Sequence, residues 1–373
     1  MKRALIQGAT ACVEGAIAAG CRFYAGYPIT PSSEIMDLFA IRMPEVGGVF
    51  IQMEDEIATI SAVIGASWAG KKAMTATSGP GLALMQESIS YAAMTETPIV
   101  IVDIQRGGPA TGTPTLPSQG DVLSARYGGH GDYEIIALCP ASAQEMFDFT
   151  VKAFELAERF RVPTFILSDA IINHLREQII IREDIIPYER KEPFQSEIGF
   201  PFKPRANLVP PMHTFGKGYR LHITGLVHDE SGFPVTSDLK LYERLIRRLS
   251  DKVNKNKREI VEFEELWLED AELAVLSYGA VARACYSGVE IARRRKLKAG
   301  LLRLKTLWPF DFEGIKRKIG ARKVLVAEMN NGQIYSLLRP WFKHCYSLRT
   351  FGDIPTPEKV YKKLKDLYGL RTP

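Results

Sequence analysis

The chain has few cysteines, and none of them lies at a spacing that holds a metal ion or an iron–sulfur cluster. The five are scattered at Cys12, Cys21, Cys139, Cys285 and Cys345, without a Cys-x-x-Cys pair. This spacing argues against a zinc ribbon and against a cysteine-ligated cluster in this chain. An odd, scattered set of thiols is typical of proteins that stay reduced, so we expect a cytoplasmic protein.

Several other signatures are missing. No apolar run approaches the ~20 residues of a membrane-spanning helix, and the first residues do not resemble a secretory leader. The net charge of +5 on 373 residues is far below that of a dedicated nucleic-acid binder. Neither the phosphate-loop pattern nor the dinucleotide fingerprint Gly-x-Gly-x-x-Gly is present. We therefore expect neither a membrane nor a nucleic acid as a partner.

What the chain does contain is a regular alternation of apolar strands and helical segments over its first 170 residues. Strands are predicted at Val49–Met53, Ala73–Thr77, Pro98–Gln105 and Pro163–Ser168. Since 46% of the residues are hydrophobic, sizeable cores are available to two or three domains. The alternation predicts an α/β fold with a doubly wound, mostly parallel sheet.

The alternation fades after residue 170 and returns near residue 266. Six prolines between residues 187 and 211 indicate an extended crossover, and the charge-rich segment Leu239–Phe263 predicts a solvated helix. From residue 266 a second series of strands and helices follows. We therefore predict a first domain at residues 1–170, a crossover or insertion region at 171–265, and a second α/β domain at 266–373.

Four polar or glycine-rich segments each follow a predicted strand directly: Tyr27–Thr30, Glu54–Glu56, Ser78–Gly81 and Arg106–Pro109. Ligands bind beyond the carboxyl ends of the strands in open sheets of this kind, so we expect one site at this rim. The whole loop at 106–121 is rich in glycine, proline and threonine. A loop of this length is either functional or disordered, and its few charges and many prolines predict an ordered lid.

Each segment also has a purely structural interpretation. Three consecutive acids can complement the macrodipole at the start of a helix. The Ser-Gly-Pro-Gly sequence can be a strand-to-helix turn with a glycine at positive φ. Ser32 or Ser33 can cap a helix, and Arg106 can form an interdomain salt bridge.

Five motifs in sequence order favour the functional interpretation: Tyr27–Ser33, Gln52–Glu56, Thr77–Gly81, Arg106–Pro109 and Pro117–Asp121. Together they resemble the alpha subunit of 2-oxoacid:ferredoxin oxidoreductases, and the 2-oxoglutarate branch fits best. The first domain then resembles the pyrimidine-binding domain of thiamine-diphosphate enzymes. The last domain resembles the C-terminal domain of transketolase-like enzymes.

The resemblance implies a catalytic role for Glu56, whose spacing to Gly65, Gly70 and the Ser-Gly-Pro-Gly turn matches the family. In that family a glutamate hydrogen-bonds the aminopyrimidine of thiamine diphosphate and so activates the cofactor. Burial would raise the pKa of such a carboxyl toward the working pH. Glu54 and Asp55 remain alternatives for this role.

Substrate and cofactor contacts are implied in the same way. A guanidinium at Arg106 can bind a carboxylate bidentately, and the resemblance implies that Arg106 and Thr30 contact the 2-oxoacid. A selective 2-oxoglutarate site needs a further donor, and the sequence leaves Arg126, His130, Lys217 and Arg220 open. The residues expected to line the pyrimidine, besides Glu56, are Tyr27, Pro28, Ser78, Gly79, Pro80 and Gly81.

One basic run also has two interpretations. The segment Arg293–Lys298 is the solvated end of a predicted helix. Alternatively, it contacts the phosphates of coenzyme A or an acidic electron carrier.

The magnesium motif of thiamine enzymes, Gly-Asp-Gly followed by a distant asparagine, is absent from this sequence. The resemblance therefore implies a beta subunit that supplies magnesium, the diphosphate site and iron–sulfur clusters, with possible gamma and ferredoxin-like delta subunits. The reaction implied is oxidative decarboxylation of 2-oxoglutarate with coenzyme A as cosubstrate and ferredoxin as electron acceptor. The alternatives are branched-chain 2-oxoacids or pyruvate, a non-oxidative decarboxylase or synthase subunit, and a silent scaffold.

Overall fold

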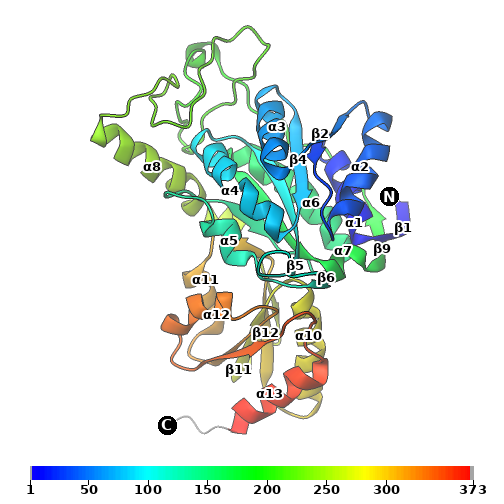
Figure 1. Cartoon of the computed structure of the whole chain (residues 1–373). Helices are drawn as coiled ribbons and strands as arrows, with labels where there is room; N and C mark the ends of the chain where they lie inside the picture. Colours follow the sequence, from blue (N-terminus) through cyan, green and yellow to red (C-terminus); the bar gives the residue numbers. More distant parts are fainter. Residues whose placement is uncertain (1, 370–373) are drawn as a thin grey trace.

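The computed structural model describes residues 2–369, and its larger sheet has eight strands (Figure 1). The strands are β2 (Cys21–Gly26), β3 (Val49–Gln52), β4 (Lys72–Thr77), β5 (Ile99–Gly107), β6 (Thr113–Pro117), β7 (Ile136–Leu138), β8 (Pro163–Asp169) and β13 (Thr306–Trp308).

The order across this sheet is β3-β2-β4-β5-β8-β7-β13, and β6 pairs with the end of β5. Strands β2, β3, β4, β5, β7 and β8 run parallel, whereas β6 and β13 are antiparallel to their neighbours. The predicted doubly wound, mostly parallel sheet is thus confirmed. Strand β3 lies on one side of β2 and β4 lies on the other, so the direction of winding reverses at β2. Ligands bind at such reversal points in open α/β sheets.

Helices cover both faces of this sheet. Apolar side chains of α1 (Gly8–Ala18), α2 (Ser33–Glu45) and α6 (Ala143–Phe160) fill the core on one face. Those of α3 (Glu56–Trp68) and α4 (Gly79–Met94) fill the core on the other. The remaining elements here are α5 (Val122–Tyr127), α7 (Ala170–His174), and the antiparallel pair β1 (Lys2–Gln7) and β9 (Arg176–Ile181).

A second sheet forms the C-terminal unit, which we define as residues 263–369 without β13. Its order is β10-β12-β11-β14-β15, parallel except for β10 at one edge. The elements are β10 (Phe263–Leu266), β11 (Leu273–Ser277), α10 (Gly279–Arg294), β12 (Ala299–Leu304), α11 (Phe312–Ile319), β14 (Lys323–Glu328), α12 (Gln333–Leu338), a 3₁₀ turn (Arg339–Trp341), β15 (Cys345–Arg349) and α13 (Pro357–Gly369). Strand β13 leaves this unit to join the first sheet, so the two sheets share one continuous apolar core.

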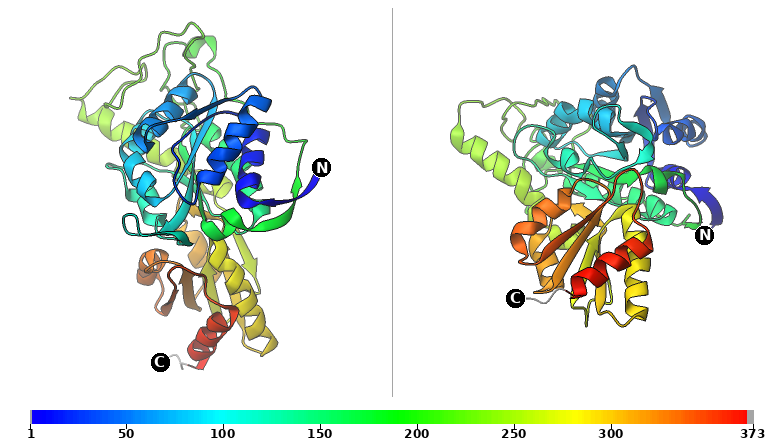
Figure 2. Two further views of the ribbon diagram at one scale, coloured as in Figure 1. Left: turned by 45° about the vertical axis from the view of Figure 1, so that its right-hand side comes forward. Right: turned by 60° about the horizontal axis from the view of Figure 1, so that its bottom comes forward.

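The region between residues 182 and 238 is mostly irregular, with a single 3₁₀ turn at Gln195–Glu197. It lies beside α3 and α4 at the end of the molecule far from the C-terminal unit (Figures 1 and 2). It leads into α8 (Leu239–Asn254) and α9 (Lys257–Ile260). The helix predicted to reach Phe263 is wrong at its end, because the chain turns after Asn254 and Phe263 begins the edge strand β10.

Helix α8 is fastened to the first sheet by a buried ion cluster. Arg248 donates two hydrogen bonds to the fully buried carboxylate of Glu96, at 2.6 and 2.9 Å, and Lys252 donates a third at 2.8 Å. Arg161 donates to the backbone oxygen of Glu96 at 2.8 Å.

None of the helices in residues 2–369 is long and apolar enough to span a membrane.

Candidate active site

The three acids after β3 have three different environments. Glu54 is exposed to solvent. Asp55 is the N-cap of α3, where its carboxylate accepts a hydrogen bond from the N–H of Ala58 at 2.7 Å. Glu56 opens the first turn of the helix and is only 5% exposed. The capping role therefore belongs to Asp55, and Glu56 is the acid that the fold buries.

The carboxyl of Glu56 packs against the Ser-Gly-Pro-Gly turn. A Cβ atom at Gly81 would overlap Oε1 of Glu56 and Oγ1 of Thr77, so glycine is required there for close packing. Burial raises the pKa of Glu56, the nearby Asp55 raises it further, and Arg106 lowers it. A buried glutamic acid with a raised pKa can exchange a hydrogen bond, and a proton, with a heterocyclic nitrogen.

The turn itself begins α4 at Gly79, with Ser78 as the N-cap residue. Ser78 is fully buried, and its hydroxyl has no hydrogen-bond partner within residues 2–369. A Cβ at Gly79 would lie 3.0 Å from Oδ2 of Asp121. The lack of a side chain at Gly79 therefore leaves room for the carboxylate of Asp121. The turn thus separates two buried acids, Glu56 and Asp121.

Arg106 lies within β5 near its end and is 8% exposed. Its Nη1 donates to the backbone oxygen of Thr30 at 2.7 Å, whereas its Nε is buried and unpartnered in the described part of the chain. Thr30 itself is exposed, as are Tyr27 and Pro28. The loops after β2 and β5 are therefore in contact. The guanidinium of Arg106 is buried behind the solvent-exposed residues of the first loop.

The structural interpretation of the segment after β2 is only partly correct. Ser32 precedes α2, but its hydroxyl donates to the oxygen of Ile29 at 2.9 Å instead of capping the helix. The predicted lid also has more structure than expected. Its second half is strand β6, in which Pro117 pairs with Arg106.

The sequence interpretation missed two acids at this rim. Asp103 is fully buried in β5, and neither of its carboxylate oxygens has a hydrogen-bond partner among residues 2–369. Asp121 lies against Gly79, and its Oδ2 is also buried and unpartnered there. The available signal for Asp103 was a single charge inside the most apolar strand, Pro98–Gln105.

The residues proposed for a distal carboxylate are dispersed. Arg126 forms an ion pair with Glu134 at 3.0 Å, and Lys217 pairs with Glu192. His130 lines a cavity between α4 and α8, and Arg220 is exposed in the irregular region. The structure does not single out any one of these as the second donor.

The basic run after α10 is engaged in local contacts. Arg293 pairs with Asp270 at 2.7 Å, and Arg294 pairs with Glu290 on the same helix at 2.7 Å. Arg295 lies over the ring of Tyr361, 4.4 Å from its centroid. These contacts agree with the interpretation of a solvated helix end.

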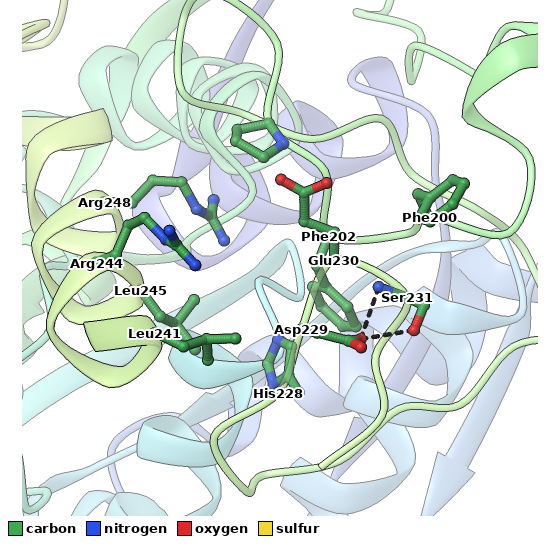
Figure 3. Close-up of a pocket in the computed structure, with 11 residues that line it drawn as sticks. Phe200, Phe202, His228, Asp229, Glu230, Ser231, Leu241, Arg244, Leu245 and Arg248 are labelled. Atoms are coloured by element: carbon green, nitrogen blue, oxygen red, sulfur yellow. Dashed lines mark hydrogen bonds between the residues drawn. The ribbon is translucent and has the colours of Figure 1, made fainter. Parts of the chain in front are cut away.

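A pocket of about 360 Å³ lies between α8 and the irregular region, away from the rim (Figure 3). Arg244 and Arg248 extend from α8 toward Phe202 and Glu230 (Figure 3). None of the predicted site residues is among the described residues that line it. We therefore place the candidate active site at the rim and not in this pocket.

The rim fits one half of a thiamine diphosphate site. It provides a buried acid with a raised pKa, a glycine turn that lets the acid pack closely, and unpartnered polar atoms on Ser78 and Arg106. A group of three or more metal-ligating side chains does not occur within residues 2–369. The chain thus offers contacts for a heterocycle and a carboxylate.

Family comparisons agree with this geometry. Residues 14–248 match the profile of the pyruvate flavodoxin/ferredoxin oxidoreductase family, thiamine diphosphate-binding domain. Residues 271–343 match the pyruvate:ferredoxin oxidoreductase core domain II. The chain is 52% identical over 335 residues to the 2-oxoglutarate synthase subunit KorA of Methanocaldococcus jannaschii, covering 90% of each chain. It is 36% identical over 375 residues to the ketoisovalerate oxidoreductase subunit VorB of Methanothermobacter thermautotrophicus, covering 99% of each.

Solved structures resemble the whole chain. The 2-oxoglutarate:ferredoxin oxidoreductase from Magnetococcus marinus, solved with 2-oxoglutarate, coenzyme A and succinyl-CoA bound, superposes with a TM-score of 0.93 at 34% identity. The match covers 98% of this chain but 65% of that longer chain. A split-gene transketolase superposes at a TM-score of 0.56 and 14% identity, which shows that the fold is shared, as the transketolase-like architecture predicted.

Proposed function

The chain belongs to the pyruvate flavodoxin/ferredoxin oxidoreductase family, and on that premise we propose that it is the alpha subunit of a 2-oxoglutarate:ferredoxin oxidoreductase. The enzyme oxidatively decarboxylates 2-oxoglutarate with coenzyme A, giving succinyl-CoA and carbon dioxide, and passes two electrons to ferredoxin. The observation that carries this proposal is the buried acid Glu56, packed against Gly81 at the rim of the first sheet.

Each rim residue has a defined task in this proposal. Thiamine diphosphate, when bound, supplies the electron sink for the decarboxylation. Glu56 holds a hydrogen bond to its pyrimidine, because burial raises the pKa of this carboxyl and so favours its protonated form. Arg106 binds the carboxylate next to the ketone, with Thr30 beside it. Tyr27, Pro28 and the turn from Ser78 to Gly81 line the cofactor.

The surface around Glu56 supports a partner chain. Large apolar side chains flank it: Ile57 is 51% exposed in the same turn, Ile51 is 38% exposed at the end of β3, and Leu84 is 51% exposed on α4. Exposed apolar groups around a half-built site are typical of a surface that a partner covers. The proposal assigns this surface to a beta subunit that carries magnesium, the diphosphate site and iron–sulfur clusters.

The wider assignments also remain part of the proposal. The five cysteines are free thiols, which supports a reducing compartment such as the cytoplasm. The three-part division at residues 170 and 265 is retained, although β13 returns to the first sheet. The proposal also assigns gamma and ferredoxin-like delta subunits to the complex.

The test is co-expression of this chain with its neighbouring subunits, followed by a panel of 2-oxoacids. We expect coenzyme A-dependent reduction of methyl viologen, fastest with 2-oxoglutarate. If the complex prefers a branched-chain 2-oxoacid or pyruvate, the proposed substrate is wrong but the proposed reaction type stands. Decarboxylation without electron transfer would instead indicate a non-oxidative enzyme, and complete inactivity of the assembled complex would contradict the proposal.

A further inference from the structure

The pocket between α8 and the irregular region has walls that hydrogen bonds hold in place. In the irregular region, Oδ1 of Asp229 accepts hydrogen bonds from the N–H of Ser231 at 2.9 Å, from its hydroxyl at 2.6 Å and from the N–H of Phe233 at 3.2 Å. The N–H of Phe202 donates to the backbone oxygen of Glu230 at 3.0 Å. Helix α8, the other wall, is fastened to the first sheet by its buried ion cluster. The pocket is therefore formed before any ligand binds.

His228 lines this pocket with one ring nitrogen left without a partner (Figure 3). The side chain is 2% exposed, and its Nδ1 lies 2.9 Å from the backbone oxygen of Leu226. A carbonyl oxygen can only accept, so Nδ1 carries the proton and Nε2 carries the lone pair. Nε2 is buried and has no hydrogen-bond partner within residues 2–369. Burial also lowers the pKa of His228, which favours the neutral ring. This nitrogen is thus an acceptor for an N–H or O–H group of a ligand.

The surroundings of His228 in the pocket are apolar. The ring of Phe202 lies 4.2 Å from the His228 ring, centroid to centroid, and is itself buried. On α8, Leu241 and Leu245 line the opposite wall. Aromatic and aliphatic side chains of this kind favour a flat, apolar group over a fully polar one. The deep part of the pocket therefore suits a ring with a single polar hydrogen.

Two opposite charges lie on facing walls of the pocket. Arg244 extends from α8, and Glu230 belongs to the facing segment of the irregular region (Figure 3). Both side chains are exposed, and neither forms an ion pair or a side-chain hydrogen bond in the part of the chain that the structure describes. Arg248 also lines the pocket, but its guanidinium is bound to the carboxylate of Glu96 at 2.6 and 2.9 Å. The free charges are therefore a guanidinium for a carboxylate and a carboxylate for an ammonium group.

We propose that this pocket binds a free aromatic α-amino acid whose side chain carries an O–H or N–H donor, as tyrosine and tryptophan do. The ligand carboxylate pairs with Arg244 and its ammonium group with Glu230. Its ring lies against Phe202 and Leu245, and the donor on the ring is accepted by Nε2 of His228. A phosphate group, with its larger negative charge, would instead be repelled by the acidic wall.

The size of the pocket agrees with one such molecule. Its volume of about 360 Å³ lies at the lower end of the range of about 300–1,000 Å³ for ligand pockets. None of the rim residues lines it, so the amino acid and the 2-oxoacid occupy separate sites. Binding can therefore be measured without turnover.

Isothermal titration calorimetry of the assembled complex with L-tyrosine, L-tryptophan and L-phenylalanine tests the proposal. We expect one L-tyrosine or one L-tryptophan to bind per copy of this chain. L-phenylalanine has the same charges and ring but no polar hydrogen on the side chain. Its affinity should be about tenfold lower than that of L-tyrosine, because Nε2 of His228 would stay buried without a donor.

A cycle of ligand and protein changes tests the charged contact. Arg244→Gln should lower the affinity for L-tyrosine about tenfold, the loss of one charge-assisted hydrogen bond. Tyramine, which lacks the carboxylate, should bind the wild type about tenfold more weakly than L-tyrosine, with no further loss in Arg244→Gln. Arg247→Gln is the matched control: Arg247 is exposed on the same helix, pairs with Glu243 and does not line the pocket. This variant should keep the wild-type affinity.

Three results would overturn the inference: no binding of any of the amino acids, equal affinities for L-tyrosine and L-phenylalanine, or wild-type affinity for L-tyrosine in Arg244→Gln. Because calorimetry needs no turnover, these results are independent of the proposed reaction. A complex that binds L-tyrosine but is inactive on every 2-oxoacid would support this site and contradict the proposed function.

Discussion

Carboxylates are buried in two regions of this molecule, and the two regions treat them in opposite ways. At the base of α8, the carboxylate of Glu96 accepts hydrogen bonds from Arg248 and Lys252; although burial alone would raise its pKa, these two cations hold it well below the usual range. At the rim, burial instead raises the pKa values of Glu56 and Asp121.

The difference separates a structural charge cluster from a reactive one. A buried, fully paired charge contributes to specific packing, and removing one partner is costly. A buried acid with few partners has a raised pKa, which is typical of functional sites. Variants of Glu96 should therefore lower the free energy of unfolding, whereas variants of Glu56 should lower kcat.

The largest expected effect is that of Glu56→Gln on turnover. The amide cannot exchange a proton with the pyrimidine, so kcat should fall by roughly 10²- to 10⁴-fold, the range of a lost acid–base group. The thermal midpoint and the assembly of the complex should stay unchanged. Glu54→Gln, at the exposed neighbour, is the matched control and should retain wild-type kcat. Similar kcat values for the two variants would remove the distinction between these acids.

Glu96→Gln is expected to show the reverse. Arg248 and Lys252 would lose their buried carboxylate, and the free energy of unfolding should fall by about 3–5 kcal/mol. Urea denaturation of the purified chain measures this value. Complex that still assembles should turn over at the wild-type rate per site, and a large loss of kcat there would break the comparison.

Arg106→Lys sharpens the chemical side of the comparison. The ammonium keeps the charge but loses the planar fork, so the KM for 2-oxoglutarate should rise about tenfold to a hundredfold. Steady-state kinetics of the assembled complex measure it. The same exchange at Arg247, an exposed residue of α8 paired with Glu243, should leave the KM unchanged. If both exchanges gave the same KM, Arg106 would not be a substrate ligand.

The smallest expected effect is on the pH dependence of the thermal midpoint. The pKa of Asp121 is raised on folding, so its contribution is present below about 3.9, its unfolded value, and is lost as the pH rises through about 6. The pKa of Glu96 is depressed, so its contribution is present above about 4.3 and lost as the pH falls. Asp121→Asn should therefore gain slightly in thermal midpoint at pH 8 relative to pH 4, whereas Glu96→Gln should lose most at pH 8.

The sequence predicted the parallel sheet because parallel strands are apolar along their whole length and local patterns show them. It did not predict β13, a three-residue strand that pairs with β7 from residues 136–138. Such a pairing depends on contacts between distant parts of the chain, which no local pattern encodes. The end of α8 was misplaced because the charged residues that follow Asn254 are equally compatible with a solvated helix and with an edge strand.

The site shows the same limit. Strand ends located the rim, and the spacing shared with the family favoured Glu56, with Glu54 and Asp55 left as alternatives. The packing that distinguishes them, with Asp55 as the cap and Glu56 against Gly81, appears only in three dimensions. Asp103 was overlooked because the rest of its strand, Pro98–Gln105, is almost entirely apolar. Gln119 was quoted in a motif, but its hydrogen-bond partners are Tyr278, Met329 and Asn330 of the C-terminal unit, which are distant in the sequence.

The most direct test measures cofactor activation itself, as the exchange of the thiazolium C2 proton of bound thiamine diphosphate against deuterium. Rapid-quench proton NMR on the assembled complex gives this rate without any substrate. We predict that Glu56→Gln slows the exchange by roughly 10²- to 10⁴-fold, while Glu54→Gln and Glu96→Gln exchange at the wild-type rate. Unchanged exchange in Glu56→Gln would contradict the assignment of this buried acid.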